Sequence, residues 1–191
     1  MWLCLGLLAA SLLCAATIDR PVARFFAVHP GWRPWFQACA TPSLLPLPLS
    51  GLYLCAAALR LLPARLAAGP WLAMSLATIT ATAAKDELKF LLGRAWPQWW
   101  LKDGVYGFHP LATSYLYGAY PSGHTAYMSA PLAVLWVVAP RARPWAVLVL
   151  ALVMAGLVGA DYHFIGDVLA GLAVGLLSAA GTLRLLAARH G

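Results

Sequence analysis

Residues 164–186 read FIGDVLAGLAVGLLSAAGTLRLL, and this stretch decides the fold. Its only charged residues are Asp167 near its start and Arg184 near its end. A helix of about 20 mostly apolar residues crosses the hydrocarbon layer of a membrane. The stretch therefore predicts a transmembrane helix.

Similar stretches recur along the chain, separated by short polar or proline-rich breaks. Six run approximately over Met1–Ile18, Ser43–Leu59, Trp71–Leu92, Gly123–Ala139, Pro144–Ala160 and Phe164–Leu186. The composition, 62% hydrophobic and 10% charged over 191 residues, is too apolar for a soluble domain. We expect an all-α, polytopic membrane helical bundle with about six transmembrane helices, in one domain over 1–191. The first stretch lacks the basic start of a signal peptide, so a retained helix is favoured over a cleaved one.

The basic residues at the ends of these stretches predict the orientation. With six spans, one side of the membrane holds no acidic residue but carries Arg60, Arg65, Arg141, Arg143, Arg184 and Arg189. By the positive-inside rule this side is cytoplasmic, together with both termini. Any polar chemistry is then expected on the opposite, outer side of the membrane. The net charge of +7 is spread over helix ends, which argues against nucleic acid as a partner.

Three polar segments are candidates for a functional site, because ionisable groups in a membrane are costly. The first, KDELKFLLGR over 85–94, ends the third stretch. An interfacial cluster in which Asp86 pairs with Lys89 is an equally good interpretation.

The second segment is YPSGHT over 120–125, at the start of the fourth stretch. A helix that begins here presents free backbone N–H groups and its dipole to an anion such as phosphate. Ser122 can cap this helix, and His124 lies in its first turn. An ordinary capped helix is the simpler alternative.

The third segment is DYHFIGD over 161–167. His163 and Asp167 are four residues apart, so on a helix the carboxylate can hold one ring nitrogen and leave the other free to attack. All three segments fall on one side of the predicted bundle. Together they predict a single pocket for phosphoryl transfer, with cations, helix N–H groups, a nucleophile and a second histidine.

These motifs resemble those of the type 2 phosphatidic acid phosphatase superfamily of membrane lipid phosphatases, which includes undecaprenyl diphosphate phosphatases. The family pattern is Lys, six residues, Arg-Pro; then Pro-Ser-Gly-His; then Ser-Arg, five residues, His, three residues, Asp. The second part is complete over 121–124, and the third keeps His163 and Asp167. The order, spacing and six-span layout cover nearly the whole chain.

The resemblance implies the catalytic roles. His163 attacks phosphorus to form a phosphohistidine, Asp167 orients His163, and His124 protonates the leaving oxygen. This mechanism requires His163 to start neutral and His124 protonated, so it predicts a bell-shaped pH dependence.

The resemblance also implies the phosphate-binding groups, namely Ser122 and the Gly123 N–H beside Lys89. The family works without a metal, and we expect no metal and no cofactor here. The substrate is expected to be a lipid phosphate or diphosphate that enters from the surrounding membrane lipids.

Two family arginines are replaced. Counting from Lys89, Arg-Pro becomes Trp96-Pro97, and Ser-Arg falls on Gly156-Leu157. We expect the nearby Arg94 to serve as the first phosphate clamp, and Lys85 to replace the second in part.

The identity of the lipid stays open among undecaprenyl diphosphate, phosphatidic acid, phosphatidylglycerol phosphate and lipid A phosphate. Two other functions are alternatives. A lipid-phosphate binding or transport protein that has lost turnover would fit the missing arginine at Leu157. An intramembrane serine protease using Ser122 is disfavoured, because its Gly-x-Ser-Gly turn is absent.

Overall fold

The computed structural model describes residues 2–188, and within them it is all-α, with no strand beyond isolated bridges. The helices are α1 (Trp2–Ala16), α2 (Asp19–Ala27), α3 (Arg33–Ala40), α4 (Pro46–Ala58), α5 (Pro70–Leu92), α6 (Pro97–Asp103), α7 (Gly123–Val138), α8 (Arg143–Gly159) and α9 (Ile165–Ala187). Met1 and Arg189, which belong to the predicted first span and the predicted cytoplasmic set, lie outside the described residues.

The six predicted stretches coincide with α1, α4, α5, α7, α8 and α9, and the largest difference at an end is Ser43 against Pro46. The number of membrane crossings stays a prediction. Within residues 2–188, three segments are long and apolar enough to cross, Pro30–Ala58, Pro140–Gly159 and Ile165–Ala187. A fourth is added if α1 and α2, bent by 64° at their junction, form one broken span.

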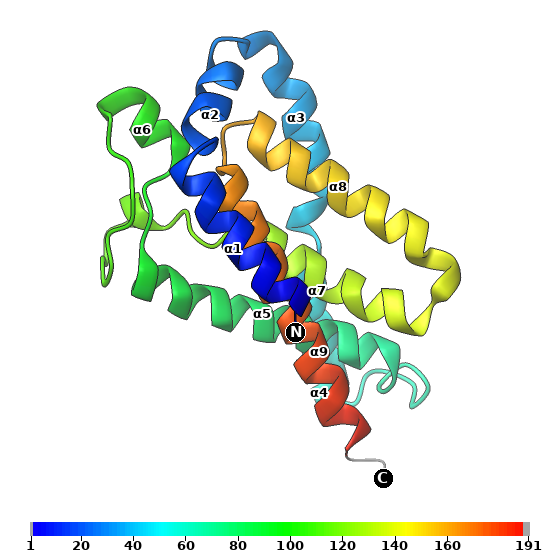
Figure 1. Cartoon of the computed structure of the whole chain (residues 1–191). Helices are drawn as coiled ribbons and strands as arrows, with labels where there is room; N and C mark the ends of the chain where they lie inside the picture. Colours follow the sequence, from blue (N-terminus) through cyan, green and yellow to red (C-terminus); the bar gives the residue numbers. More distant parts are fainter. Residues whose placement is uncertain (1, 189–191) are drawn as a thin grey trace.

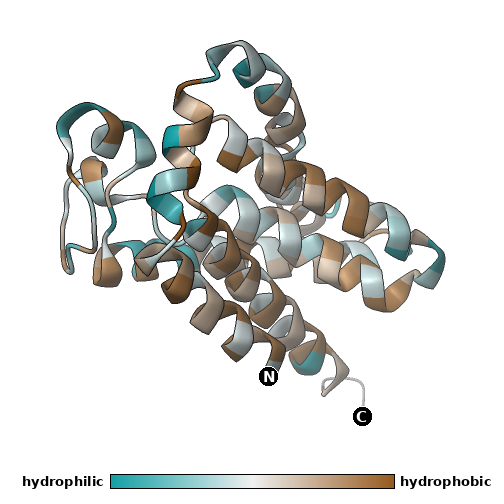
Figure 2. Ribbon diagram, turned by 45° about the horizontal axis from the view of Figure 1, so that its top comes forward, coloured by the Kyte–Doolittle hydropathy of each residue, from teal (hydrophilic) through white to brown (hydrophobic). Residues whose placement is uncertain are grey.

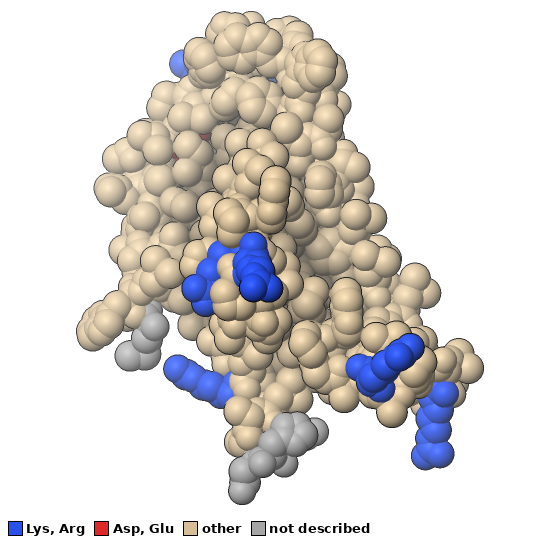
Figure 3. All heavy atoms as spheres, turned by 90° about the vertical axis from the view of Figure 1, so that its right-hand side faces the viewer, with Lys and Arg blue, Asp and Glu red and all other residues tan. Residues whose placement is uncertain are grey.

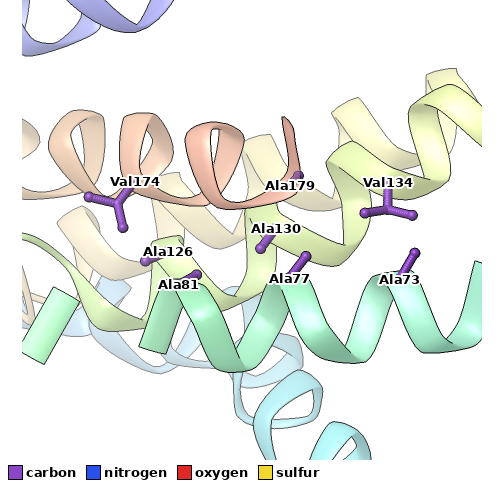
Figure 4. Close-up of a cluster of buried hydrophobic side chains, with 8 residues drawn as sticks. All are labelled: Ala73, Ala77, Ala81, Ala126, Ala130, Val134, Val174 and Ala179. Carbon is purple, nitrogen blue, oxygen red and sulfur yellow. The ribbon is translucent and has the colours of Figure 1, made fainter. Parts of the chain in front are cut away.

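The centre of the bundle is the contact of α5, α7 and α9. Small side chains fill it, as Figure 4 shows, and they are Ala73, Ala77, Ala81, Ala126, Ala130, Val134, Val174 and Ala179. Small residues let membrane helices approach closely enough to pack backbone against backbone. Helix α1 packs along α9, and α3 packs on α8 (Figure 1).

Two glycines bring α9 against the first turns of α7. A Cβ atom added to Gly171 would lie 3.0 Å from the Cβ of Thr125 and 3.2 Å from the carbonyl carbon of Ser122. One turn later, a Cβ on Gly175 would lie 2.5 Å from the carbonyl oxygen of Ala126. Because α9 can approach this closely, the N–H of Ser122 donates a hydrogen bond to the carbonyl oxygen of Asp167 (2.9 Å). This contact joins two of the three predicted motifs.

The polar groups are divided between the two ends of the bundle. Hydrophobic residues run along the helices, and strongly hydrophilic ones lie mainly at helix ends and connections (Figure 2). On the face in Figure 3, most of the basic side chains lie toward the end that carries the C-terminus. Helix α6 and its connections lie at the other end (Figure 1).

Candidate active site

A pocket of about 510 Å³ lies between the loop before α9, helix α3 and the turn that follows α3. Its lining is mostly aromatic and polar, and it includes Gln37, Thr41, Trp96, Gln98, Tyr115, His124, Leu157, Asp161, Tyr162 and His163. One wall is closed by a hydrogen bond that the amide of Gln37 donates to the hydroxyl of Tyr162 (3.1 Å). The pocket therefore holds both histidines of the predicted site.

His163 lies between this pocket and Asp167. Its Nδ1 is 3.6 Å from Asp167 Oδ2, which is within ion-pair range but longer than a hydrogen bond. The same Oδ2 accepts a hydrogen bond from the N–H of Phe164 (3.0 Å), which holds the carboxylate at the start of α9. Burial lowers the pKa of His163 and Asp167 raises it, with a net lowering that keeps the ring neutral at neutral pH.

His124 lies on the first turn of α7, and its ring centroid is 6.0 Å from that of His163. The helix begins as predicted, because Ser122 is its N-cap and accepts a hydrogen bond from the N–H of Thr125 (3.3 Å). The hydroxyl of Thr125 donates to the same oxygen (3.1 Å), so the Ser122 proton is free for another acceptor. Ser122 and Gly123 are both buried directly before His124, and neither of them lines the pocket.

Lys89 and Lys85 reach the site from α5. The ammonium group of Lys89 lies 5.1 Å from the centroid of the Trp96 ring and donates to the carbonyl oxygen of Gly118. Lys85 packs on Gly123, where an added Cβ would lie 3.3 Å from its Cε. Lys85 forms an ion pair with its neighbour Asp86, so Asp86 pairs with Lys85 and not with Lys89. Both lysines thus lie near the N-terminus of α7.

Arg94 does not occupy the position expected of a phosphate clamp. Its side chain is fully buried, and its guanidinium is bound to Asp19 and Asp167 behind His163. The physical reason is the backbone: α5 ends at Leu92, and the extended chain at Arg94 pairs with residues 117–119. This pairing directs the side chain toward Asp167 and away from the pocket.

The two positions that hold arginine in the family pattern are occupied here by Trp96 and Leu157, and neither side chain carries a charge. The ring of Trp96 packs on that of His163, with centroids 5.0 Å apart, and stacks on Tyr115. Leu157 is buried and lines the pocket, and its carbonyl oxygen accepts hydrogen bonds from the N–H groups of Tyr162 and His163. The expectation that Lys85 replaces the second arginine in part stays a prediction.

Asp19 and Asp161 were not predicted as site residues. Asp161 lines the pocket at a positive φ of 56°, and its Oδ1 is buried without a hydrogen-bond partner. Burial raises the pKa of Asp161 to about 6, although the charge of Arg33 lowers this pKa in part. Asp19 is fully buried at the start of α2. An acidic residue directly after an apolar stretch is a signal that marks Asp19 as a candidate.

Comparison with known proteins identifies a protein family and a similar solved structure. A family model described as the PAP2 superfamily matches residues 70–190. Among solved structures, the crystal structure of a transmembrane PAP2-type phosphatidylglycerolphosphate phosphatase from Bacillus subtilis is similar, with a TM-score of 0.61 and 19% identity. The match covers 97% of this chain and 96% of that one, and at this identity it shows a shared fold. No curated protein sequence matches the chain significantly.

Proposed function

Because the chain belongs to the PAP2 superfamily, we propose that it is an integral membrane phosphatase that removes phosphate from a lipid, with His163 as nucleophile. One observation carries the proposal: the His163 ring lines the pocket and has the Asp167 carboxylate 3.6 Å behind its Nδ1. A neutral imidazole oriented in this way is a nucleophile for phosphorus.

The reaction has two steps. The free ring nitrogen of His163 attacks phosphorus, the bond from phosphorus to the leaving oxygen breaks, and His124 donates its proton to that oxygen. His124, now neutral, takes a proton from a water molecule, which attacks the phosphohistidine and releases phosphate. Both rings line the pocket, and their centroids are 6.0 Å apart, so both can act on one phosphoryl group bound in the pocket. Each histidine ends the cycle in its starting state.

Phosphate binding is assigned to the N-terminus of α7 and to α5. The Ser122 hydroxyl and the Gly123 N–H supply hydrogen bonds, and the helix dipole adds partial positive charge. Lys89 supplies a full charge, with Lys85 as a weaker contributor. Phosphoryl transfer depends mainly on positioning and charge neutralisation, so this set can act without a metal.

The membrane setting restricts the substrate to amphiphiles. We propose a lipid phosphate or an isoprenyl diphosphate that reaches the pocket from the bilayer. The proposed location is a bacterial inner membrane, with the pocket on the periplasmic side. The distribution of arginine supports this orientation. Arg60, Arg141 and Arg184 lie at the ends of apolar stretches on the side of the membrane opposite to the pocket, and the positive-inside rule makes that side cytoplasmic.

A second candidate is a lipid-phosphate binding or transport protein without turnover. Trp96 and Leu157 favour it, because they leave fewer cations to stabilise the transition state than the family pattern provides. The protease alternative gains no support, since within the described residues Ser122 Oγ is hydrogen-bonded to Thr125 and to no histidine.

The test is phosphate release from a panel of lipid phosphates and diphosphates by purified protein in EDTA. We expect release by the wild type, loss of release in His163→Ala, and retention in the control His29→Ala, whose ring packs on Trp32 outside the pocket. Tight binding of a lipid phosphate without release would favour the binding protein. Release that survives in His163→Ala would exclude His163 as the nucleophile.

A further inference from the structure

Arg94 is held at the centre of a buried ionic cluster. Its Nη1 donates to Asp167 Oδ1 (2.6 Å), and its Nη2 donates to Asp19 Oδ2 (2.8 Å) and to the hydroxyl of Tyr106 (2.7 Å). The guanidinium also lies 4.5 Å from the ring centroid of Phe164. A buried arginine is costly unless its charge is paired, and here two carboxylates balance the charge and bind the Nη groups, while Nε has no partner among the described residues.

The cluster fixes the carboxylate that faces the nucleophile. Arg94 holds Oδ1 of Asp167, and the Phe164 N–H holds Oδ2, so the carboxylate plane cannot rotate without breaking a bond. In this orientation Oδ2 is the oxygen nearest to His163 Nδ1. Arg94 therefore acts on His163 through Asp167 and does not touch the pocket itself.

The N-terminal helices complete the cluster from outside the part of the chain that matches the family model. Asp19 Oδ1 accepts the N–H of Gly166 (3.0 Å), and the hydroxyl of Ser11 donates to the carbonyl oxygen of Gly166 (2.7 Å). Gly166 fits this site because an added Cβ would lie 2.7 Å from the Ser11 carbonyl and 2.8 Å from Asp19 Oδ2. Helices α1 and α2 thus hold the start of α9, three residues after His163.

We propose that Asp19 and Arg94 are positioning residues for His163: the Asp19–Arg94–Asp167 cluster sets the orientation of the Asp167 carboxylate and the net charge behind the nucleophile. The proposal rests on the proposed phosphatase function for its kinetic test. It reverses the sequence-based expectation that Arg94 binds phosphate directly.

The charge of the cluster gives the proposal a distinctive consequence. One cation and two carboxylates leave a net charge of about −1 beside His163, which favours the imidazolium that forms when the ring is protonated. Asp19→Asn reduces this negative charge, whereas Arg94→Lys preserves it. Other groups that act on the His163 region are unchanged in both variants, and these are Lys89 from α5, His124 from α7, and Asp161 with its neighbour Arg33.

The experiment measures kcat, KM and the acid-side midpoint of kcat/KM for the full-length protein on the lipid phosphate that it hydrolyses best. In both variants kcat falls by about 10–100-fold, as for other partners that orient a reactive group, and KM stays within about twofold. The acid-side midpoint moves to lower pH in Asp19→Asn and stays in place in Arg94→Lys. The controls are the exposed Asp103→Asn and Arg184→Met, which should match the wild type.

A second measurement does not depend on turnover. The rate at which diethyl pyrocarbonate modifies His163, followed by mass spectrometry across pH, reports the protonation of the ring. Its midpoint moves to lower pH in Asp19→Asn and not in Asp103→Asn. If the wild type releases no phosphate, the phosphatase proposal fails, and this midpoint still decides the role of the cluster.

Two results would overturn the inference. A rise in KM at constant kcat in Arg94→Lys would make Arg94 a phosphate ligand. A lower melting temperature in Asp19→Asn, with the folded protein keeping the wild-type kcat and both wild-type midpoints, would reduce the cluster to a structural brace. Should Asp19→Asn fail to fold, the ratio of kcat to KM effects in Arg94→Lys decides between ligand and positioning residue.

Discussion

Gly171→Ala tests whether the close contact of α9 with α7 builds the site. The added methyl group would lie 3.0 Å from Thr125 Cβ and 3.2 Å from the Ser122 carbonyl carbon, against an ordinary carbon contact of about 3.5–4.0 Å. The helices must therefore separate by roughly 0.5–1 Å at this point. This displacement moves the N-terminus of α7 away from His163, which lies two residues before the start of α9.

The magnitudes follow from this displacement. Overpacking of a tight contact costs about 1–3 kcal/mol of stability. A misplacement of about 1 Å between reacting groups costs roughly 100-fold in rate, so kcat/KM should fall by about 10–100-fold. The assay is phosphate release at saturating and limiting lipid, with the melting temperature in detergent measured in parallel.

The matched control is Gly181→Ala on the same helix, where no atom lies within 4 Å of the added Cβ. It should keep wild-type activity and gain about 0.5–1 kcal/mol of stability, because alanine favours the helix. Wild-type activity and stability in Gly171→Ala would refute the argument that this contact positions the site.

Three further predictions address the chemistry and the charge of the pocket. His124→Ala should slow formation of the phosphohistidine from a lipid phosphate by about 10²–10⁴-fold but its formation from an aryl phosphate with an acidic leaving group far less, because in this first step only the poor leaving group needs a proton. Equal losses in the first step on both substrates would contradict the general-acid role. Leu157→Arg adds a cation where the family has one, so inhibition by vanadate should tighten about tenfold, the value of one charge-assisted hydrogen bond, and an unchanged inhibition constant would show that the new side chain does not reach the pocket. Asp161→Asn should raise the melting temperature at pH 7–8 and not at pH 4. The pKa of Asp161 in the folded protein, about 6, lies above the ordinary 3.8, so the stability of the wild type falls as the pH rises between these two values. An equal gain in melting temperature at both pH values would exclude ionisation of Asp161 as its cause.

The long helices were predictable because membrane-spanning length leaves a direct trace in sequence. Trp71–Leu92 was expected and α5 runs Pro70–Leu92; Phe164–Leu186 was expected and α9 runs Ile165–Ala187. Helices α2, α3 and α6 were not predicted, because segments of seven to nine residues rich in aromatic and proline residues resemble interfacial connections. Six crossings stay a prediction, because three segments within residues 2–188, or four with α1 and α2 joined, have the length and apolarity of a membrane span.

The candidate site was predictable in part. His163, Asp167 and the start of α7 were expected together because their segments lie on one side of the predicted bundle, and the structure brings them together, although His163 lies in the loop before α9 and not on a helix. The partner of Arg94 was not predictable, because Asp19 lies 75 positions away in the chain and meets it only after α1 and α2 have packed on α9. Arg94 was predicted to bind phosphate because it lies two residues before the family's arginine position. Helix α5 ends at Leu92, however, and the chain that follows directs the Arg94 side chain away from the pocket.

The role of His163 as nucleophile is tested most directly by trapping the intermediate. Protein mixed with a lipid phosphate that carries labelled phosphorus is quenched in alkali within a single turnover, and its peptides are analysed for bound phosphate. We predict label on the peptide that carries His163, formed and lost at rates that match turnover, and no label in His163→Ala. Label on another residue, or turnover in His163→Ala at the wild-type rate, would contradict the account.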